Sequence, residues 1–423
     1  MGSVVEINPF TRVEGHGSLK VYLDGARVER VELCLTESPR LFEALLVGRS
    51  FAEVPEVICR ICSLCSTIHK VTALLALEKA FGIEVSRVTR LTRELICHGG
   101  LIQSHSLHLY CLLLPDLLEV RGVAELAREA PELLKAGLAI KRVGNLIQET
   151  VGGRLIHPVN ITLGGLGQRI GRDSLLLMRD ELDAILPSCR ETLGLFRSPF
   201  AFPLLPAPSY LALEPSEVPY SGSLLRMGDG RGFPVEAYRD FVAEEVVPQS
   251  HAKYARVLGQ FPTVGSLSRL NLAPPVTADA REIFETVKGE IIAQDMRGNA
   301  VAQAIELYQA AERSRAVVDE LLQIGRDGAG NVEVVPRSGR GTAACEAPRG
   351  LLIHSYAFGA GGVCTEADVI TPTSLNQGAL SLDLLALARA LEGADPTRMV
   401  GALERLVRSY DPCISCSVHL VRL

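Results

Sequence analysis

Hydrophobic and polar residues alternate along the first part of the chain. Two alternating stretches, 18–23 and 27–33, are separated by the turn dipeptide Asp24-Gly25. This pattern is typical of a β-hairpin, in which successive side chains face opposite sides of the sheet. We therefore expect residues 1–60 to carry a small β-sheet.

From residue 66 onward apolar residues recur at helical spacing, which predicts a mainly helical part over 61–423. Ser86 has the side chain of an N-cap, and Asp395 followed by Pro396 indicates another helix start. The expected helices cover 66–81 with Gly82 as a stop, 86–114 ended by Pro115-Asp116, 174–195 interrupted or ended near Pro187, about 291–324, 379–391 and 397–410. Residues 332–335 predict a short strand, whereas 200–235 and 339–363 are rich in glycine or proline. The expected fold class is α+β, mainly α, in one domain over 1–423.

Composition and charge exclude several classes of protein. The 423 residues carry 43 basic and 49 acidic side chains, a net charge of −6, which argues against a nucleic-acid scaffold. No apolar run is long enough to span a bilayer, and the first residues lack the pattern of a secretory signal, so we expect a cytoplasmic protein. Eleven cysteines, an odd number in a large chain, favour metal ligands over a disulfide scaffold.

Two short segments place paired cysteines near opposite ends of the chain. Residues 60–69 read RICSLCSTIH and residues 411–419 read DPCISCSVH. Two residues between cysteines let both sulfurs face one metal ion. Four thiolates suit zinc, iron–sulfur or nickel chemistry, and a single pair can also be a redox dithiol. The spacing alone leaves these alternatives open.

These two segments resemble the metal-binding signatures of nickel–iron hydrogenase large subunits. The residues of the cysteine motifs are most similar to those of the cytosolic, NAD(P)-linked or sulfhydrogenase-type branch. Ser63, however, stands where the family commonly has glycine. The resemblance covers the full chain in family order. Its other motifs are Arg12-Val-Glu-Gly-His16, Phe42-Glu43 with Gly48-Arg49, Ser104-His105 with His108-Leu-Tyr110 and Pro115-Asp116, Gly153-Arg154 with His157-Pro158 and Gly164-Gly165, Glu346-Ala-Pro-Arg-Gly350, and Thr371-Pro-Thr-Ser-Leu-Asn376.

The resemblance implies a nickel–iron centre with carbonyl and cyanide ligands on iron. The four ligands of nickel would be Cys62, Cys65, Cys413 and Cys416, of which Cys65 and Cys416 would bridge to iron. Cys413 and then Glu14 would take the proton from H₂. A buried carboxylate suits a relay, because burial raises its pKa towards the working pH.

The resemblance also implies roles for residues around this centre. The guanidinium of Arg349 would lie over the open metal position, with Asp116 and Asp411 as its carboxylate neighbours. The further expectations are that Pro348 shapes the pocket, Thr373 bonds a cyanide, His69 donates to a cysteine sulfur, and Glu43, His419 and the carbonyl of Val369 bind Mg²⁺.

The implied activity is the reversible conversion of H₂ to protons and electrons. The implied partners are an iron–sulfur small subunit, flavin and iron–sulfur subunits of the diaphorase type leading to NAD(P), nickel-insertion factors, and a protease that removes residues 420–423. We expect no nucleic-acid partner and no direct membrane span.

Three alternatives stay open at this point. A hydrogen sensor would share the site but serve regulation. A non-catalytic scaffold within quinone-reducing complexes would lack the four cysteines that this chain has, whereas a zinc-binding relative would use them as structural ligands. A dinucleotide enzyme is indicated only weakly, because the glycines of 164–171 miss the G-x-G-x-x-G spacing.

Overall fold

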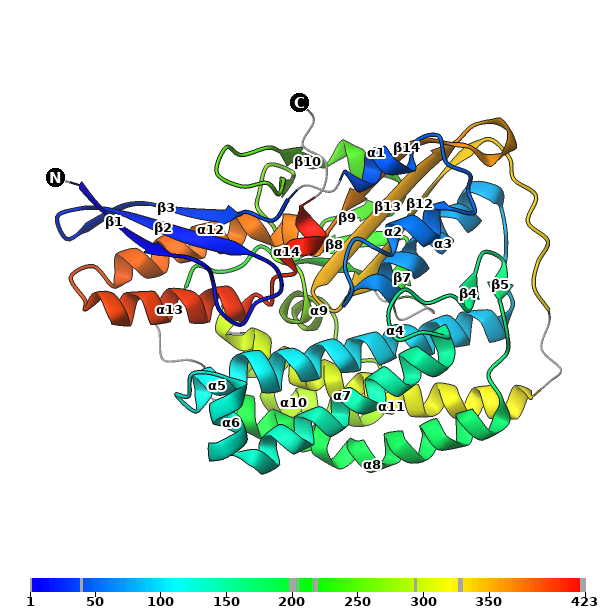
Figure 1. Cartoon of the computed structure of the whole chain (residues 1–423), viewed down its shortest axis with the longest axis horizontal. Coiled ribbons are helices and arrows are strands. Elements are labelled where there is room, and N and C mark those ends of the chain that lie inside the picture. The colour runs from blue at the N-terminus through cyan, green and yellow to red at the C-terminus, as the bar shows by residue number, and fades with distance from the viewer. Residues whose placement is uncertain are drawn as a thin grey trace.

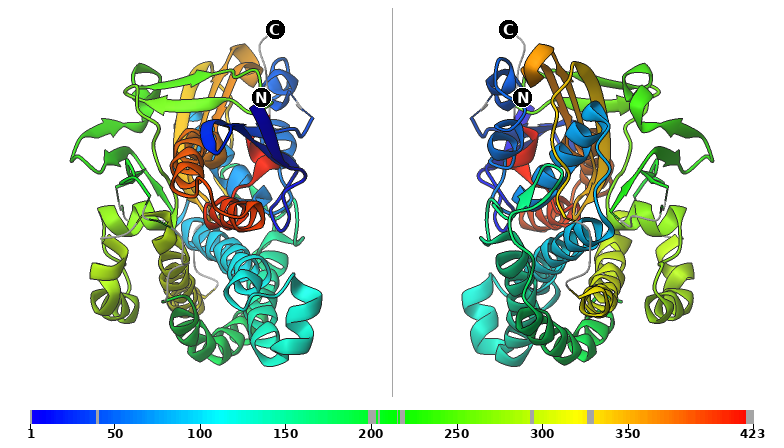
Figure 2. Two further views of the ribbon diagram at one scale, coloured as in Figure 1. Left: turned by 90° about the vertical axis from the view of Figure 1, so that its left-hand side faces the viewer. Right: turned by 90° about the vertical axis from the view of Figure 1, so that its right-hand side faces the viewer.

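Long helices and a set of β-sheets form two parts of the molecule. The computed structural model of the chain describes residues 2–38, 41–197, 203, 205–214, 216, 220–292, 295–325 and 330–418. In Figures 1 and 2 the long helices lie along one side, and the sheets with the shorter helices lie along the other. The expected α+β, mainly α class is confirmed.

The helical part is built on four helices that pack along one another. They are α4 (Arg87–Leu107), α7 (Pro131–Gly152), α8 (Arg172–Phe196) and α11 (Asn299–Ile324), with α10 (Ala278–Ile292) beside α11. The Ser86 hydroxyl caps α4 as expected, accepting a hydrogen bond of 3.2 Å from the Thr89 amide.

At its C-terminal end α4 changes character instead of ending. A π-helical turn, η1 (His108–Leu113), leads directly into the short helix α5 (Leu114–Leu117), which contains Pro115. Proline has no amide hydrogen, so the regular hydrogen-bond ladder cannot pass through it. The wider turn accommodates this loss and turns His108 into the interior, where it is buried.

The larger sheet comes from the C-terminal part and has the strand order β14-β13-β12-β7. Its strands are β12 (Gly339–Ala347), β13 (Gly350–Phe358), β14 (Cys364–Ile370) and the short β7 (Ser221–Gly222), all antiparallel. Helix α3 (Ser66–Phe81) lies against β12 so closely that a Cβ at Gly341 would stand 1.9 Å from the Ala76 carbonyl oxygen. Glycine at 341 therefore lets the helix that follows Cys65 approach the sheet.

The N-terminal sheet joins β1 (Gly2–Ile7), β2 (Gly17–Asp24) and β3 (Arg27–Leu35), which confirms the predicted hairpin. Helices α12 (Pro372–Ala390) and α13 (Pro396–Ser409) lie beside it (Figure 1). The remaining elements are short: α1 (Phe42–Leu46), α2 (Val54–Ile58), α6 (Val123–Glu129), α9 (Ser266–Leu272), α14 (Ile414–Ser417), η2 (Val235–Asp240), η3 (Met296–Gly298), η4 (Ala360–Gly362), β4 (Ile161–Thr162), β5 (Gly165–Leu166), β6 (Leu211–Leu213), β8 (Leu224–Met227), β9 (Gly232–Pro234), β10 (Val242–Glu245) and β11 (Tyr254–Val257).

Several predicted elements differ from the structure. Helix α8 runs through Pro187 without a break, because the buried face that it presents to its neighbours outweighs one missing hydrogen bond. The helix expected from about 291 begins at Asn299, after the side chain of Asp295 caps η3. Residues 332–335 form no strand. The helix expected over 379–391 begins at Pro372, where Thr371 and Ser374 form a capping box.

Two hydrophobic clusters make up the core, one on each side of β13. Leu352 and Tyr356 face the larger cluster, and Leu351 and Ile353 face the smaller one. A strand buried on both faces has no polar alternation, which is why 339–363 was recognised only as glycine-rich.

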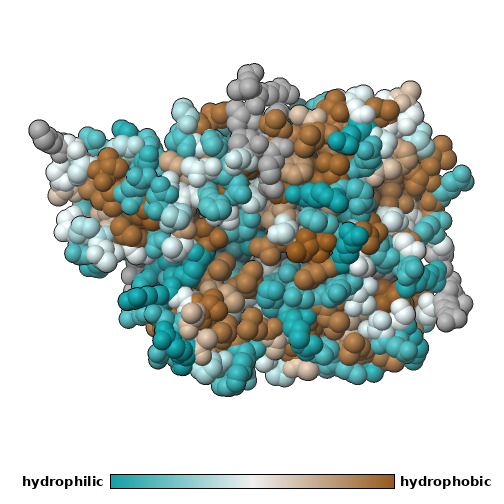
Figure 3. Space-filling view, in the orientation of Figure 1, coloured by the Kyte–Doolittle hydropathy of each residue, from teal (hydrophilic) through white to brown (hydrophobic). Residues whose placement is uncertain are grey.

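Hydrophobic and hydrophilic residues are interspersed on the face drawn in Figure 3. Within the described part of the chain, none of the helices combines the length and apolarity that crossing a bilayer requires.

Candidate metal centre

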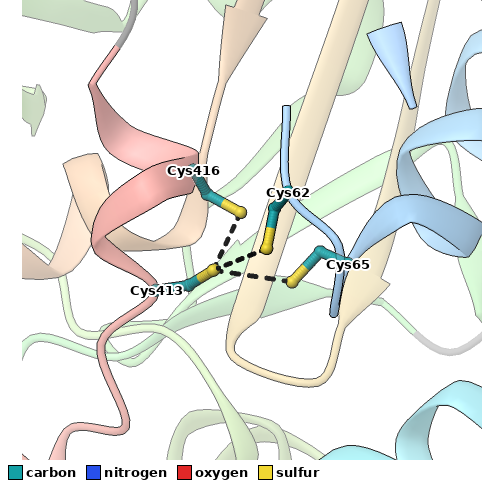
Figure 4. A group of neighbouring side chains, drawn as sticks. All are labelled: Cys62, Cys65, Cys413 and Cys416. Atoms are coloured by element: carbon teal, nitrogen blue, oxygen red, sulfur yellow. Dashed lines mark hydrogen bonds between the residues drawn. The ribbon is translucent and has the colours of Figure 1, made fainter. Parts of the chain in front are cut away.

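Four cysteine sulfurs from opposite ends of the chain converge in the interior (Figure 4). Cys62 and Cys65 lie in the loop between α2 and α3, and Cys413 and Cys416 lie at α14. The Sγ of Cys413 is 3.3 Å from that of Cys62, 3.8 Å from that of Cys65 and 3.0 Å from that of Cys416. All four sulfurs lie within 4.8 Å of one another, which confirms that the two motifs form one cluster.

The fold fixes both cysteine pairs through their backbones. Cys65 is the residue directly before α3, so the helix sets its position. The amide of Cys413 donates to the Thr373 hydroxyl at 3.0 Å, and the amide of Ile414 donates to the Glu14 carbonyl at 3.2 Å. The N-terminal loop, α12 and the C-terminal segment thus meet at one place.

The cluster has the chemistry of a metal-binding site. Thiolates bound about 2.3 Å from one tetrahedral metal lie about 3.8 Å apart, close to the spacing seen here. Hydrogen bonds from the other three cysteines lower the pKa of Cys62, whereas burial raises the pKa of Cys413 and of Cys416. Several thiolates cannot stay charged together in the interior without a cation, so this donor set fits a soft metal.

Glu14 lies beside the cluster and is partly buried. Its Oε2 accepts a hydrogen bond of 3.1 Å from the Ser415 amide. Burial, and then the negative charge of Cys62, raise the pKa of the Glu14 carboxyl. A carboxyl adjusted in this way can exchange protons nearer neutral pH than a solvated one.

Arg349 reaches the cluster from the turn between β12 and β13. Its Nη1 is 3.7 Å from the Sγ of Cys65, and its Nε donates to the carbonyl oxygen of Asp411 at 2.9 Å. Its Nη2 pairs with Asp411 Oδ1 at 3.1 Å. Burial opposes the charge of Arg349, but Asp411 and the cysteines more than offset it, so the pKa of the guanidinium is raised. The structure therefore places one of the two expected carboxylates, Asp411, against Arg349.

The second expected carboxylate, Asp116, has other partners. It accepts from Arg12 Nη2 at 2.5 Å and from Arg408 Nε at 2.6 Å, and it makes no ion pair with Arg349. The π-helical turn before it directs this carboxylate toward the N-terminal loop and α13. The prediction that Asp116 lies against Arg349 is wrong.

Three further predicted residues border the cluster. The Thr373 hydroxyl accepts from the Cys413 amide, so its proton is free to point elsewhere. The ring of His69 lies with Nδ1 3.1 Å from Nε2 of the buried His354, whose Nδ1 is 2.7 Å from the Tyr356 hydroxyl. Pro348 is buried in the turn that carries Arg349.

Glu43 and Val369 lie together at the edge of the larger sheet. Glu43 Oε1 accepts from the Val369 amide at 2.9 Å, and Glu43 Oε2 is 3.7 Å from Lys253 Nζ. Lys253 in turn pairs with Glu244 at 2.5 Å. Buried carboxylate oxygens of this kind suit Mg²⁺. His419 and the tail 420–423 lie outside the described residues.

The remaining cysteines are buried thiols with no ligand role in the cluster. Burial raises the pKa of Cys189 and of Cys345 to about 12, which keeps them protonated and inert. Gly164 and Gly165 belong to the antiparallel ribbon of β4 and β5, which is held by Asn331, whereas Gly171 directly precedes α8. A dinucleotide-binding turn needs a strand, a turn and a helix in one parallel unit, so this alternative is excluded for the segment.

Sequence reasoning missed several polar residues that position the site. Gln303 donates to Asp411 Oδ2 at 3.2 Å, and Arg269 forms ion pairs with Glu306 and Glu346. Gln303 and Glu306 are isolated polar residues in an apolar stretch of α11. That isolation is the sequence feature by which they could have been recognised.

Comparisons with known proteins agree with this geometry. The family described as nickel-dependent hydrogenase matches residues 40–145 and 250–419, and a family described as HoxL-like matches residues 4–37. Sulfhydrogenase 2 subunit alpha of Pyrococcus furiosus is 36% identical over 99% of this chain and 100% of its own. Sulfhydrogenase 1 subunit alpha of the same organism is 35% identical over 99% of this chain and 98% of its own.

Solved structures show the same fold. The crystal structure of an NAD⁺-reducing [NiFe]-hydrogenase in the H₂-reduced state matches with a TM-score of 0.88 and 27% identity over 99% of both chains. The reduced Ni-Fe-Se hydrogenase of D. vulgaris Hildenborough matches with a TM-score of 0.78 and 22% identity, covering 99% of this chain and 100% of that one.

The fold and the four-cysteine cluster define the metal-bearing large subunit of a hydrogenase. The chain belongs to the nickel-dependent hydrogenase family, and it is an oxidoreductase with a nickel–iron site. The presence of all four cysteines separates it from cysteine-less scaffold relatives.

Proposed function

We propose that this chain splits and forms H₂ reversibly and passes the electrons through an iron–sulfur small subunit to NAD(P). The observation that carries the proposal is the cluster of four sulfurs within 4.8 Å, with Arg349 and Glu14 against it. A bound nickel–iron centre, with carbonyl and cyanide on iron, supplies the two-electron chemistry that heterolytic cleavage needs. The protein residues supply ligands, proton transfer and electrostatic support.

Proton transfer is assigned to Cys413 and Glu14. The two residues lie side by side, because Glu14 pairs with Cys413 as an isolated parallel bridge. Glu14 has a raised pKa, so its carboxyl can accept a proton released at the cluster and pass it outward. Cys65 and Cys416 are proposed as the bridging ligands.

Arg349 and Thr373 are proposed to support the ligands and the reacting atoms. The guanidinium of Arg349 presents fixed donors and a positive charge next to Cys65, with Asp411 holding its direction. The Thr373 hydroxyl can donate to a cyanide while it accepts from Cys413. Pro348 fixes the turn that carries Arg349. His69 lies near this site because it belongs to α3, the helix that follows Cys65. Asp116 keeps a supporting role, because it joins Arg12 to Arg408.

Magnesium, partners and maturation complete the proposal. Glu43, Val369 and His419 are proposed to hold Mg²⁺ near the C-terminus. Electrons must leave the chain, because the remaining cysteines supply no iron–sulfur ligand set, so an iron–sulfur small subunit is required. The relative that reduces NAD⁺ supports further flavin and iron–sulfur subunits of the diaphorase type. We also propose that a protease removes residues 420–423 after nickel insertion. We place the enzyme in the cytoplasm.

Metal analysis of enzyme purified anaerobically from its own host, with an infrared spectrum of the same sample, tests the metal assignment. We expect nickel near one per chain together with carbonyl and cyanide bands. Zinc alone, in a sample whose tail has been removed, would contradict it. A hydrogen sensor would show the same bands but low turnover with every electron acceptor.

The Glu14→Gln variant tests the proton path. The amide keeps the size of the side chain but cannot carry a proton, so we expect the metal content to stay and hydrogen–deuterium exchange to fall by about a hundredfold or more. The matched control is Glu32→Gln on β3, which we expect to exchange at the normal rate. Full exchange by Glu14→Gln would end the relay assignment.

A further inference from the structure

A second arginine, Arg269, lies directly beneath the turn that carries Arg349 and is 14% exposed. Arg269 on α9 donates from Nε and Nη2 to the two carboxylate oxygens of Glu306, each at 2.6 Å. Its Nη1 donates to Glu346 Oε2 at 2.8 Å. Glu306 belongs to α11, so the guanidinium fastens the helical part to the end of β12. A bidentate arginine–carboxylate pair fixes direction as well as distance.

The same guanidinium also holds the backbone next to Arg349. Arg269 Nη1 donates to the carbonyl of Ala347 at 3.1 Å, and Nη2 donates to the carbonyl of Pro348 at 3.3 Å. These are the two carbonyl groups just before Arg349, in a turn so tight that Ala347 pairs with Gly350. The turn rests on the start of α9, where a Cβ at Gly265 would stand 3.2 Å from the Arg349 carbonyl oxygen.

Arg269 is separated from the cluster by Arg349 and is balanced by two carboxylates. Its ion pairs are with Glu306 and Glu346, and no ion pair or hydrogen bond joins it to the described cysteines of the cluster. Arg269 instead sets the position of the backbone from which the side chain of Arg349 extends. Asp411 holds the guanidinium of that side chain.

We propose that Arg269, anchored by Glu306, is a positioning residue that sets the backbone of Arg349 over the metal cluster. The inference rests on the proposed role of Arg349. A displacement of about 1 Å at a reacting centre is enough to cost on the order of a hundredfold in rate.

The Arg269→Lys variant of the complete, metal-loaded enzyme tests the inference. Lysine keeps the charge but loses the planar fork and the paired carbonyl contacts. A cavity of about 80 Å³ beside Arg269, Glu306 and Pro348 leaves room for water to fill the lost volume. We expect nickel content and infrared bands to stay, and kcat for H₂ oxidation to fall about tenfold or more.

The matched control is Arg93→Lys. Arg93 is buried, binds Glu78 through both Nη atoms at 2.7 and 2.6 Å, and donates to the Thr162 carbonyl at 2.9 Å, but its partners lie away from the cluster. We expect its kcat to stay within about twofold of the parent enzyme. An Arg269→Lys enzyme as active as Arg93→Lys would overturn the inference.

A double-variant cycle separates positioning from general damage. If Arg269 acts through Arg349, Arg269→Lys lowers kcat in the parent enzyme but lowers it no further in an Arg349→Lys background. Equal losses in both backgrounds would overturn the inference and leave the role of Arg349 intact. Full activity of Arg349→Lys would overturn that role and the inference together.

Where Arg269→Lys fails to accumulate, Glu346→Gln is the second test. It weakens one anchor of Arg269 while the oxygen that accepts from the Leu213 amide remains. We expect a loss of a few-fold in kcat that disappears in the Arg349→Lys background. A loss of the same size in both backgrounds would overturn the inference.

Discussion

The Asp383 side chain links α12 to the segment that leads to the cluster. The Tyr410 hydroxyl donates to Asp383 Oδ2 at 2.6 Å, and both residues are buried. Burial raises the pKa of Asp383 to about 7. An aspartate in an unfolded chain has a pKa of about 3.9. The folded protein therefore keeps a proton that the unfolded chain has already lost.

This difference predicts a pH-dependent stability. Between pH of about 4 and about 7 the folded state binds more protons, so the free energy of unfolding falls as pH rises and levels off above about 7. Asp383→Asn removes this dependence, and we expect a higher melting temperature than the parent at pH 8 and a much smaller difference at pH 4.5. Asp180→Asn, at an exposed position on α8, is the control. Melting temperatures of the parent and of Asp383→Asn that change in parallel with pH would contradict the prediction.

Single residues also show where sequence reasoning reaches its limit. The position of Asp411 follows from its place two residues before Cys413. Asp116 is fixed by a π-helical turn and by Arg408, which lies 292 positions away, so nothing local reveals its partner. The position of Asp411 can thus be inferred from its neighbour in the sequence, whereas the partners of Asp116 depend on side chains that are distant in the sequence.

At the scale of elements, helices α4 and α7 approach each other closely. A Cβ at Gly144 would stand 2.6 Å from the Gln103 amide nitrogen and 2.7 Å from the Gly99 carbonyl oxygen. These are backbone atoms of α4 and cannot rotate away. Glycine at 144 is therefore required by close approach of two helices.

Gly144→Ala is expected to destabilise the enzyme although alanine favours helix. Alanine gains about 1 kcal/mol in helix propensity, and overpacking costs about 1–3 kcal/mol. The cost outweighs the gain here because the added methyl group meets backbone atoms. Gly401→Ala in α13 is the matched control, since its Cβ would meet nothing within 4 Å. We expect thermal unfolding to show a lower melting temperature for Gly144→Ala and an unchanged or higher one for Gly401→Ala. The reverse order would contradict this account of the packing.

Elements with clear end signals were predicted well. Gly82 ends α3 in the left-handed conformation with a φ of 66°, and Asp395 caps α13. Helix α7 was missed, because Ala130 offers no capping side chain at its start. The sheet of β12, β13 and β14 was missed because its strands are buried on both faces.

At the scale of the molecule, the metal centre joins the two ends of the chain. Cys65 and Cys413 are 348 positions apart and their sulfurs are 3.8 Å apart. No rule based on cysteine spacing predicts that the two pairs form one site. The resemblance to a known family was the basis for that prediction. In a simple chain model, a metal that holds both cysteine pairs together in the unfolded chain lowers the entropy of that chain by an amount worth about 6 kcal/mol.

Metal loading should therefore stabilise the whole fold. We expect nickel-loaded enzyme to melt several degrees above metal-free enzyme, and Cys416→Ser to abolish both this difference and all H₂ turnover. Calorimetry of the two forms measures the shift. Cys189→Ala, a buried thiol in α8, is the control and should keep the metal-dependent difference. Equal melting temperatures with and without metal would contradict a centre that ties the ends together.

The same meeting of ends sets an order of events during synthesis. The ribosome makes Cys62 and Cys65 early and must add some 348 further residues before the second pair exists. At about 5–20 residues per second this takes roughly 20–70 seconds. For that interval the first two thiols have no partners, and a metal ion that arrives then meets half a site. Loading of the complete four-cysteine site can therefore begin only after Cys416 has been synthesised.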